Sequence, residues 1–200
     1  MNPLKVLLEE RTANWKEATQ EIFTNHPIAI KFRGQFSAII RDLIHDKYPN
    51  FIVKSSVGAG NWANIPWLSI LDPQITETTQ DGIYPVYLFK ADGTGFYLSL
   101  NQGTTNPEKK YGRLKANDLL NQRRDSLLEG INGLSEWGVK SIALNASTSL
   151  GKSYEKSNIS AKYYDAETIP NDEQLSKDLF SMLDFYSTAK KIYRDKNLME

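Results

Sequence analysis

The sequence predicts an α+β fold in which a central, mostly antiparallel, curved β-sheet is flanked by N-terminal, middle and C-terminal helices. Near both ends of the chain and in its middle, apolar residues recur with the period of an amphipathic helix. Between residues 51 and 107 the pattern changes to short runs rich in β-branched and aromatic residues, which is typical of strands. The segment 91–95 contains the Asp-Gly pair of a tight turn, so the runs on either side of it are expected to pair as a hairpin.

The composition suits one soluble globular domain. The chain has 200 residues, of which 40% are hydrophobic and 24% charged, and this length can bury a core without disulfides. Cysteine is absent, which excludes thiolate metal sites and fits a reducing cytoplasm, the expected location. The formal net charge is zero, so binding to DNA would depend on a local basic face. No apolar run approaches the length of a membrane span, so no membrane partner is expected.

Two helices are expected before the sheet. Residues 3–23 carry apolar side chains at roughly helical spacing, and Asn25-His26-Pro27 ends this helix. A second helix is expected over residues 28–46. It ends before Pro49, because the residue that precedes a proline avoids the helical conformation.

Four strand-like runs follow, over residues 51–57, 65–71, 83–90 and 96–100. The segment Gly58-Ala59-Gly60-Asn61 is expected to form a tight loop between the first two runs. Its glycines favour a turn that needs positive φ. The alternative for this loop is a nest of backbone N–H groups that binds an anion.

The rest of the chain is predicted to alternate between polar connections and regular elements. A polar connection (102–113), a helix (114–137), a short strand (141–144), a polar loop (145–157), a strand (159–164) and a helix from 173 past 193 are expected in this order. We expect a single domain over residues 1–200. It divides into a helical N-terminal part (1–50), a sheet core (51–107), a helix with further pocket loops (108–170) and a C-terminal helix (171–200). The chain ends without a compact terminus, so it is expected to be a piece of a longer protein.

Catalytic motifs are incomplete in this sequence. Gly151-Lys152-Ser153 resembles the end of a phosphate-binding loop, but Ala146 stands where that motif needs its first glycine, so a basic surface turn is expected instead. A metal-dependent nuclease needs several carboxylates gathered on neighbouring strands. The acidic residues considered for this role have no such spacing: Asp42, Asp46, Asp72 and Asp92. We therefore expect a domain that is not an enzyme and that has no metal and no cofactor.

Aromatic residues are concentrated in the predicted sheet. Tyr84 and Leu88 are four positions apart in one strand, so their side chains share a face, and Trp67 lies in the neighbouring strand. Together they would form a slot for a flat ring, which is the chemistry needed to hold a nucleobase that has left the DNA helix. The alternative for aromatic residues in a sheet is core packing, and for Phe89 and Phe96 it is favoured.

Two longer motifs identify a family resemblance. The segments Gly60-Asn-Trp-Ala-Asn-Ile-Pro-Trp67 and Gly82-Ile-Tyr-Pro-Val86 resemble the N-terminal domain of McrB-type proteins, the specificity subunit of modified-cytosine-dependent restriction systems. The resemblance implies a domain that binds double-stranded DNA and flips a modified cytosine, with 5-methylcytosine as the leading candidate, into a pocket. It also implies a GTPase motor domain on the same chain, a separate nuclease subunit and a role in restriction-modification and phage defence.

The resemblance also assigns site residues by position. The base pocket would consist of Trp67, Tyr84, Leu88 and Leu150, of which Leu150 replaces an aromatic residue. The loop that enters the DNA would consist of Gly58, Ala59, Gly60, Asn61 and Trp62. Ala59 stands where the family has the tyrosine that fills the gap left by the flipped base, so Trp62 is the candidate for that role. Contacts to the DNA backbone are expected from Lys54, Lys90, Lys109, Lys110, Arg113 and Lys152, for each of which a solvated surface charge is the alternative.

A second class of function stays open at this point. The neutral net charge, Ala59 and Leu150 would also suit a protein-interaction or assembly domain whose pocket has diverged and no longer reads a base. An enzyme, such as a nuclease, is a third alternative that the motifs do not favour.

Overall fold

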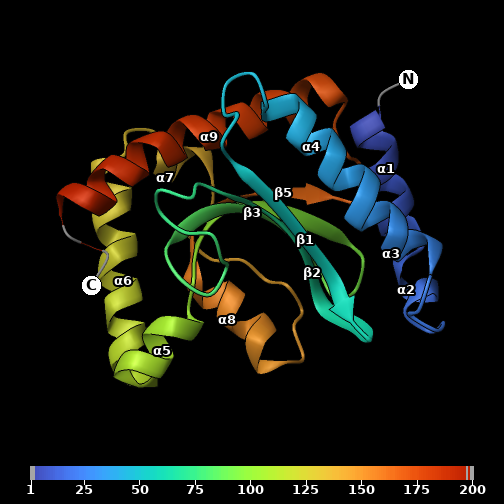
Figure 1. Cartoon of the computed structure of the whole chain (residues 1–200), viewed down its shortest axis with the longest axis horizontal. Coiled ribbons are helices and arrows are strands. Elements are labelled where there is room, and N and C mark those ends of the chain that lie inside the picture. The colour runs from blue at the N-terminus through green and yellow to red at the C-terminus, as the bar shows by residue number, and fades with distance from the viewer. Residues whose placement is uncertain (1–2, 197, 199–200) are drawn as a thin grey trace.

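A five-stranded antiparallel sheet forms the centre of the protein (Figure 1). The computed structural model describes residues 3–196 and 198. The strands lie side by side in chain order, so each pairs with its neighbours along the chain, and the first and last strands form the two edges. Their bounds are β1 (Ile52–Ala59), β2 (Asn61–Leu71), β3 (Ile83–Phe89), β4 (Gly95–Gln102) and β5 (Asn158–Asp165). The predicted α+β class and the antiparallel sheet are therefore confirmed.

Helices cover both faces of the sheet, unequally. The N-terminal layer consists of α1 (Pro3–Ala13), α2 (Trp15–Ala18), α3 (Pro27–Lys31), the π-helical turn η1 (Phe32–Phe36) and α4 (Ser37–Ile44). Between β4 and β5 the chain forms α5 (Thr105–Tyr111), α6 (Arg113–Gly130), α7 (Leu134–Trp137) and α8 (Ser149–Ser157), and α9 (Asp172–Asp195) follows β5. The N-terminal helices and α9 lie over one face, whereas α8 and the segment before it lie over the other (Figure 1).

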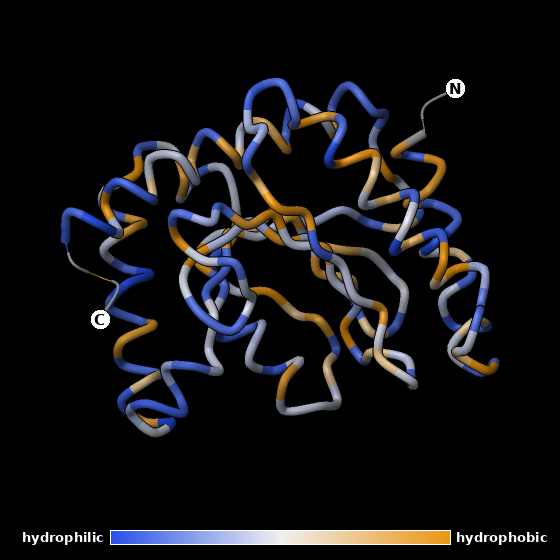
Figure 2. Tube along the Cα trace, in the orientation of Figure 1, coloured by the Kyte–Doolittle hydropathy of each residue, from blue (hydrophilic) through white to orange (hydrophobic). Residues whose placement is uncertain are grey.

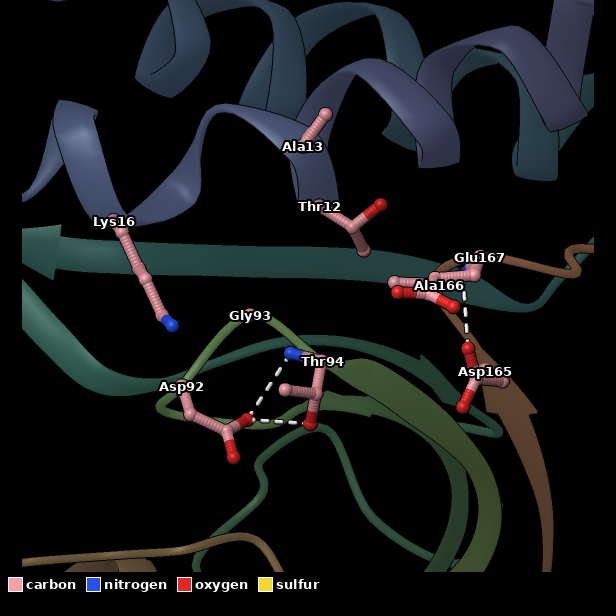
Figure 3. Close-up of a pocket in the computed structure, with 9 residues that line it drawn as sticks. All are labelled: Thr12, Ala13, Lys16, Asp92, Gly93, Thr94, Asp165, Ala166 and Glu167. Atoms are coloured by element: carbon pink, nitrogen blue, oxygen red, sulfur yellow. Dashed lines mark hydrogen bonds between the residues drawn. The ribbon is translucent and has the colours of Figure 1, made fainter.

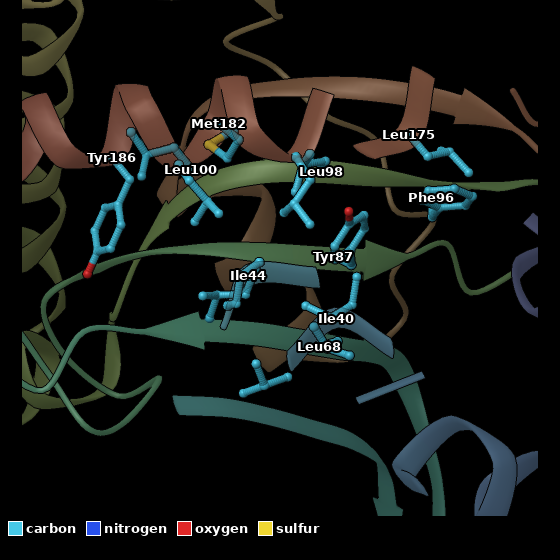
Figure 4. Close-up of a cluster of buried hydrophobic side chains, with 14 of the residues drawn as sticks. Ile40, Ile44, Leu68, Tyr87, Phe96, Leu98, Leu100, Leu175, Met182 and Tyr186 are labelled. Carbon is cyan, nitrogen blue, oxygen red and sulfur yellow. The ribbon is translucent and has the colours of Figure 1, made fainter. Parts of the chain in front are cut away.

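The main hydrophobic core lies between the sheet and the layer that contains α1, α4 and α9. Leu68, Tyr87 and Leu98 come from successive strands, and they pack in one cluster with Ile40 of α4 and Met182 of α9 (Figure 4). These residues alternate along their strands with residues on the opposite face. Hydropathy follows the same division, because the central strands are largely apolar and polar residues concentrate on the outer sides of the helices (Figure 2).

A smaller hydrophobic cluster lies on the opposite face of the sheet. Its strand residues include Tyr84, Val86 and Leu88 of β3, and Leu144 packs on them from the segment between α7 and α8. Because β3 is buried on both faces, it reads as a continuous run of buried residues and not as a strict alternation. This smaller cluster contains the predicted base slot.

Two predicted loops are helices in the structure. The connection 102–113 contains α5, in which Pro107 occupies the first turn, where a backbone N–H has no partner within the helix. The loop 145–157 contains α8, whose first turn is capped by the Thr148 hydroxyl, which accepts a hydrogen bond from the Gly151 amide at 3.1 Å. The segment Gly151-Lys152-Ser153 is thus helical and is not the surface turn that we predicted.

The other corrections concern breaks in regular elements. The helix predicted over 3–23 ends at Ala13 and resumes only as the short α2, because Asn14 leaves the helical conformation with φ −103° and ψ 8°. The helix predicted over 114–137 is divided into α6 and α7, and Gly133 between them has a φ of 82°. The strand predicted over 141–144 is absent; Val139 makes one bridge to Ala161, and the chain then crosses the smaller cluster. The predicted C-terminal segment 171–200 includes residues 197, 199 and 200, which lie outside the described residues.

Candidate nucleic-acid interface

The predicted DNA-entering loop is the tip of the β1–β2 hairpin. Ala59 pairs with Asn61, and Gly60 makes the turn with a φ of 79°. Gly58 has a φ of 125°, and a Cβ atom there would lie 1.8 Å from the Asn61 carbonyl oxygen, so the backbone can pass only if this residue has no side chain. The two glycines therefore serve the hairpin, as the turn interpretation predicts. Ala59, Gly60 and Asn61 are exposed at the tip.

Trp62 is held against the helical layer. Its indole Nε1 donates a hydrogen bond to the Glu21 carbonyl oxygen at 3.0 Å. Its ring makes edge contacts with the rings of Trp15, Phe23 and His26 at centroid distances of 5.3, 5.1 and 5.0 Å. To enter a DNA helix, Trp62 would have to break all of these contacts. The packing therefore argues against the role of gap-filling residue that we considered for it.

Trp67, Tyr84 and Leu88 share one face of the sheet. Trp67 lies directly opposite Leu88 in the β2–β3 register. Tyr84 is four residues along β3, about 13 Å away at the usual rise of a strand. Val86 lies between Tyr84 and Leu88 on the same face, so it forms the floor of the slot between these two side chains. The Tyr84 hydroxyl donates a hydrogen bond to the Thr79 carbonyl oxygen at 2.8 Å, which fixes the ring.

A roof of residues 139–148 closes this slot in the structure. Leu88 is 0% and Tyr84 1% exposed, whereas Trp67 is only partly buried. Several hydrogen bonds tie the roof. The Leu144 amide donates to Glu155 Oε1 at 2.6 Å, the Leu144 carbonyl oxygen accepts from the Ala91 amide at 2.9 Å, and the Ser147 amide donates to Asn64 Oδ1 at 2.9 Å. The Asn145 side chain also donates to Asp92. A base can reach Leu88 only if this segment moves.

Tyr154 completes the aromatic surroundings of the slot. It lies on α8 and packs against the smaller cluster, and burial raises the pKa of its hydroxyl to about 12. Burial, together with the nearby Tyr154 and Asp81, also raises the pKa of Tyr84 well above its usual value. Sequence reasoning did not select Tyr154, because it treated this segment as a loop. The signal available was Leu150 and Tyr154 at helical spacing after the capping Thr148.

Leu150 faces a different part of the surface. Its side chain is 55% exposed, and it lies on the wall of a cleft of about 450 Å³ together with Lys109 and Arg113. The structure thus brings three predicted site residues together, but as an outer cleft that is separate from the buried slot. Lys152 is also exposed on α8, and Lys110 lies 4.9 Å from the ring centroid of Tyr111 on α5.

The two remaining predicted backbone contacts lie elsewhere and have protein partners. Lys54 on β1 donates to the Glu77 carbonyl oxygen at 2.5 Å. Lys90, at the end of β3, donates to the Thr94 hydroxyl at 2.6 Å and lies 3.7 Å from Asp92. These contacts hold the loop after β2 and the β3–β4 turn.

A second cleft, of about 500 Å³, lies beside the β3–β4 turn (Figure 3). Asp92, Asp165 and Glu167 line it, with Lys16 on the opposite wall. Burial alone would raise the pKa of Asp92, but hydrogen bonds from Thr94 and Asn145 outweigh it, so the pKa lies below its usual value. Over residues 3–196 and 198, no three His, Cys, Asp or Glu side chains gather in a way that could hold a metal ion.

Comparison with known families agrees with the two sequence motifs. Residues 11–191 match the family described as MrcB-like, N-terminal domain. The chain belongs to this family. Membership supports a DNA-binding module of a McrB-like system, as the resemblance implies. No curated protein matches the sequence of this MrcB-like domain. In the part of the domain that the structure describes, no helix has the length and apolarity that crossing a membrane requires.

Proposed function

We propose that this MrcB-like domain is the specificity module of a McrBC-like, modification-dependent restriction system. It reads a modified cytosine, in the first instance 5-methylcytosine, by taking the base out of the duplex into the slot between β2, β3 and α8. The observation that supports the proposal is the shared face of Trp67, Tyr84 and Leu88, to which Tyr154 adds a further ring. The domain performs no catalysis and uses no cofactor of its own.

The slot has the chemistry that a flipped base needs. Extrusion of a base costs a few kcal/mol, and stacking between aromatic side chains offsets part of this cost. A methyl group at C5 of cytosine adds a small apolar surface. Its burial against Leu88 or Trp67 contributes about 0.8 kcal/mol. The preference for a modified over an unmodified base is therefore expected to be modest unless other groups add to it.

The roof over the slot is proposed to open when DNA binds. Residues 139–148 have no regular secondary structure beyond the bridge at Val139, so they can move without loss of a strand or helix. The hydrogen bonds described above, to Glu155, Ala91, Asp92 and Asn64, would break. Trp67 is already accessible and would meet the base first.

Basic residues beside the slot are proposed to contact phosphates. Lys109 and Arg113 share one cleft, and Lys152 is exposed on the neighbouring α8. Such contacts position a duplex without reading its sequence. The GTPase motor domain on the same chain and the separate nuclease subunit belong to this proposal as partners.

Substitution of Trp67 tests the proposal. In a binding series on duplexes with and without 5-methylcytosine, Trp67→Ala is expected to weaken binding to the modified duplex by about 10-fold, since stacking of one base contributes about 1–3 kcal/mol. Binding to the unmodified duplex should change much less. Trp137→Ala removes a partly buried tryptophan that contacts Phe185 of α9, and it serves as the matched control. Equal affinity of the wild-type protein for both duplexes at several salt concentrations would refute the reading of the methyl group.

The closed slot favours one alternative function. If the roof never opens, the smaller cluster is simply a second core, and the domain would serve in protein interaction or assembly. No binding to any modified duplex by the folded protein would support this alternative.

A further inference from the structure

Two clefts lie along the same side of α6. The first, of about 450 Å³, is lined by Thr104, Thr105, Glu108, Lys109, Arg113, Ser149, Leu150 and Ser153. The second, of about 280 Å³, is lined by Asn117, Leu120, Asn121, Arg124 and Lys156. The first cleft lies between α5, the start of α6 and α8, and the second lies between α6 and Lys156 of α8.

Helical periodicity joins the two clefts into one groove. Arg113, Asn117, Asn121 and Arg124 are spaced by four, four and three residues, so they form one row along α6. Ser149, Ser153 and Lys156 form a matching row along α8. We call the space between these rows the α6–α8 groove.

The groove is basic in a protein whose net charge is zero. Four cations line it, namely Lys109, Arg113, Arg124 and Lys156, against one carboxylate, Glu108. Arg124 donates to Asn121 Oδ1 at 2.9 Å and lies 3.6 Å from Asp125. Within the described residues, Lys109, Arg113 and Lys156 have no ion-pair partner, so their charges are available to a ligand.

The neutral lining residues indicate what kind of anion fits. They are mainly hydroxyl and amide side chains, which donate hydrogen bonds to phosphate oxygens. No aromatic side chain lines either cleft, so the groove offers no surface on which a base would stack. This is the chemistry of a backbone contact.

We propose that the α6–α8 groove holds the phosphodiester backbone of one DNA strand. The proposal rests on the proposed function and extends it by Arg124 and Lys156, which continue the row that begins at Lys109 and Arg113. From Arg113 to Arg124 the helix rises about 16 Å. This is the axial length of about five phosphates of one strand. Since α8 also carries Tyr154, a strand in the groove lies beside the helix that forms one side of the base slot.

The test is the salt dependence of binding to an unmodified duplex. Each phosphate that a cation neutralises contributes about 0.9 to the slope of log K against log salt. The double variant Arg124→Gln/Lys156→Gln is expected to reduce this slope by about 2 and to weaken binding by 10-fold or more at low salt. Lys177→Gln/Lys191→Gln removes two exposed lysines from α9, on the other side of the sheet, and should leave the slope unchanged. Far-ultraviolet circular dichroism and thermal midpoints establish that both variants are folded.

The outcomes separate this inference from the proposed function. If the slope of log K against log salt is unchanged in the folded Arg124→Gln/Lys156→Gln variant, the groove does not hold the DNA backbone, even if the wild-type protein prefers the modified duplex. A reduced slope with no preference for the modified duplex would support the groove and refute base reading. Competition by polyglutamate as effective as that by DNA would also overturn the proposal, because the groove would then accept any polyanion. If the wild-type protein binds no DNA, both proposals fail.

Discussion

The least expected residue in the structure is Arg11, whose guanidinium is buried without a hydrogen-bond acceptor. Its side chain is 4% exposed, and none of its three nitrogens has a hydrogen-bond partner. The guanidinium carbon lies 3.8 Å from the ring centroid of Trp15 and 4.4 Å from that of Phe89. Burial holds the pKa of Arg11 well below its usual value, because the charged form loses its hydration. Cation–π attraction offsets part of this cost.

Replacement of Arg11 by methionine measures which of these two effects is larger. Methionine keeps the length of the side chain and its contact with the rings but removes the desolvated charge. We expect Arg11→Met to raise the free energy of unfolding by about 1 kcal/mol or more, as for other buried charges replaced by apolar residues. Urea denaturation measures the change, with the exposed Arg41→Met as a control near zero. A loss of about 2 kcal/mol would instead show that the ring contacts dominate.

The β1–β2 hairpin permits a matched test of backbone geometry at the scale of one element. Gly58→Ala places a methyl group against the Asn61 carbonyl oxygen, and the backbone must move. Gly60→Ala meets no atom within 4 Å and adds only the strain of positive φ. We expect Gly58→Ala to destabilise the protein by about 3 kcal/mol and Gly60→Ala by about 1 kcal/mol, measured by urea denaturation. Equal losses would contradict the close approach at Gly58.

Elements with a strong apolar period could be predicted from the sequence, and short polar ones could not. Five of the six predicted strands are confirmed to within four residues, because β-branched and aromatic residues alternate or run continuously there, whereas the strand predicted over 141–144 is absent. The helices α5 and α8 were missed, since most of their residues are polar and their stability comes from caps and tertiary contacts. The same cause hid Tyr154, because its direction depends on α8. Alternation did place Tyr84 and Leu88 on one face, and the β2–β3 register adds Trp67 to it. Alternation could not reveal the roof of residues 139–148, which comes from a distant part of the chain.

At the scale of the whole molecule, the sheet separates two cores that both contain buried tyrosines. Tyr84 and Tyr154 belong to the smaller cluster, and Tyr87, Tyr164 and Tyr186 belong to the main core. Burial raises the pKa of every one of these hydroxyls, because ionisation inside the protein would leave a charge without water. Both cores are therefore expected to unfold in the same alkaline pH range.

The raised pKa values of the buried tyrosines set an upper pH limit to the stability of the folded protein. Unfolded tyrosines ionise near pH 10. Tyr154 keeps its proton in the folded protein to about pH 12. Between these values the folded state binds more protons than the unfolded state, so the free energy of unfolding falls as pH rises. The tyrosines should leave the free energy of unfolding unchanged below about pH 10 and make it decline steeply above that pH. Urea denaturation at several pH values measures the decline, and Tyr154→Phe should make it shallower. Tyrosinate absorbance follows ionisation in the folded protein. If all 10 tyrosines ionised near pH 10, the burial of the tyrosines in the smaller cluster and in the main core would be contradicted.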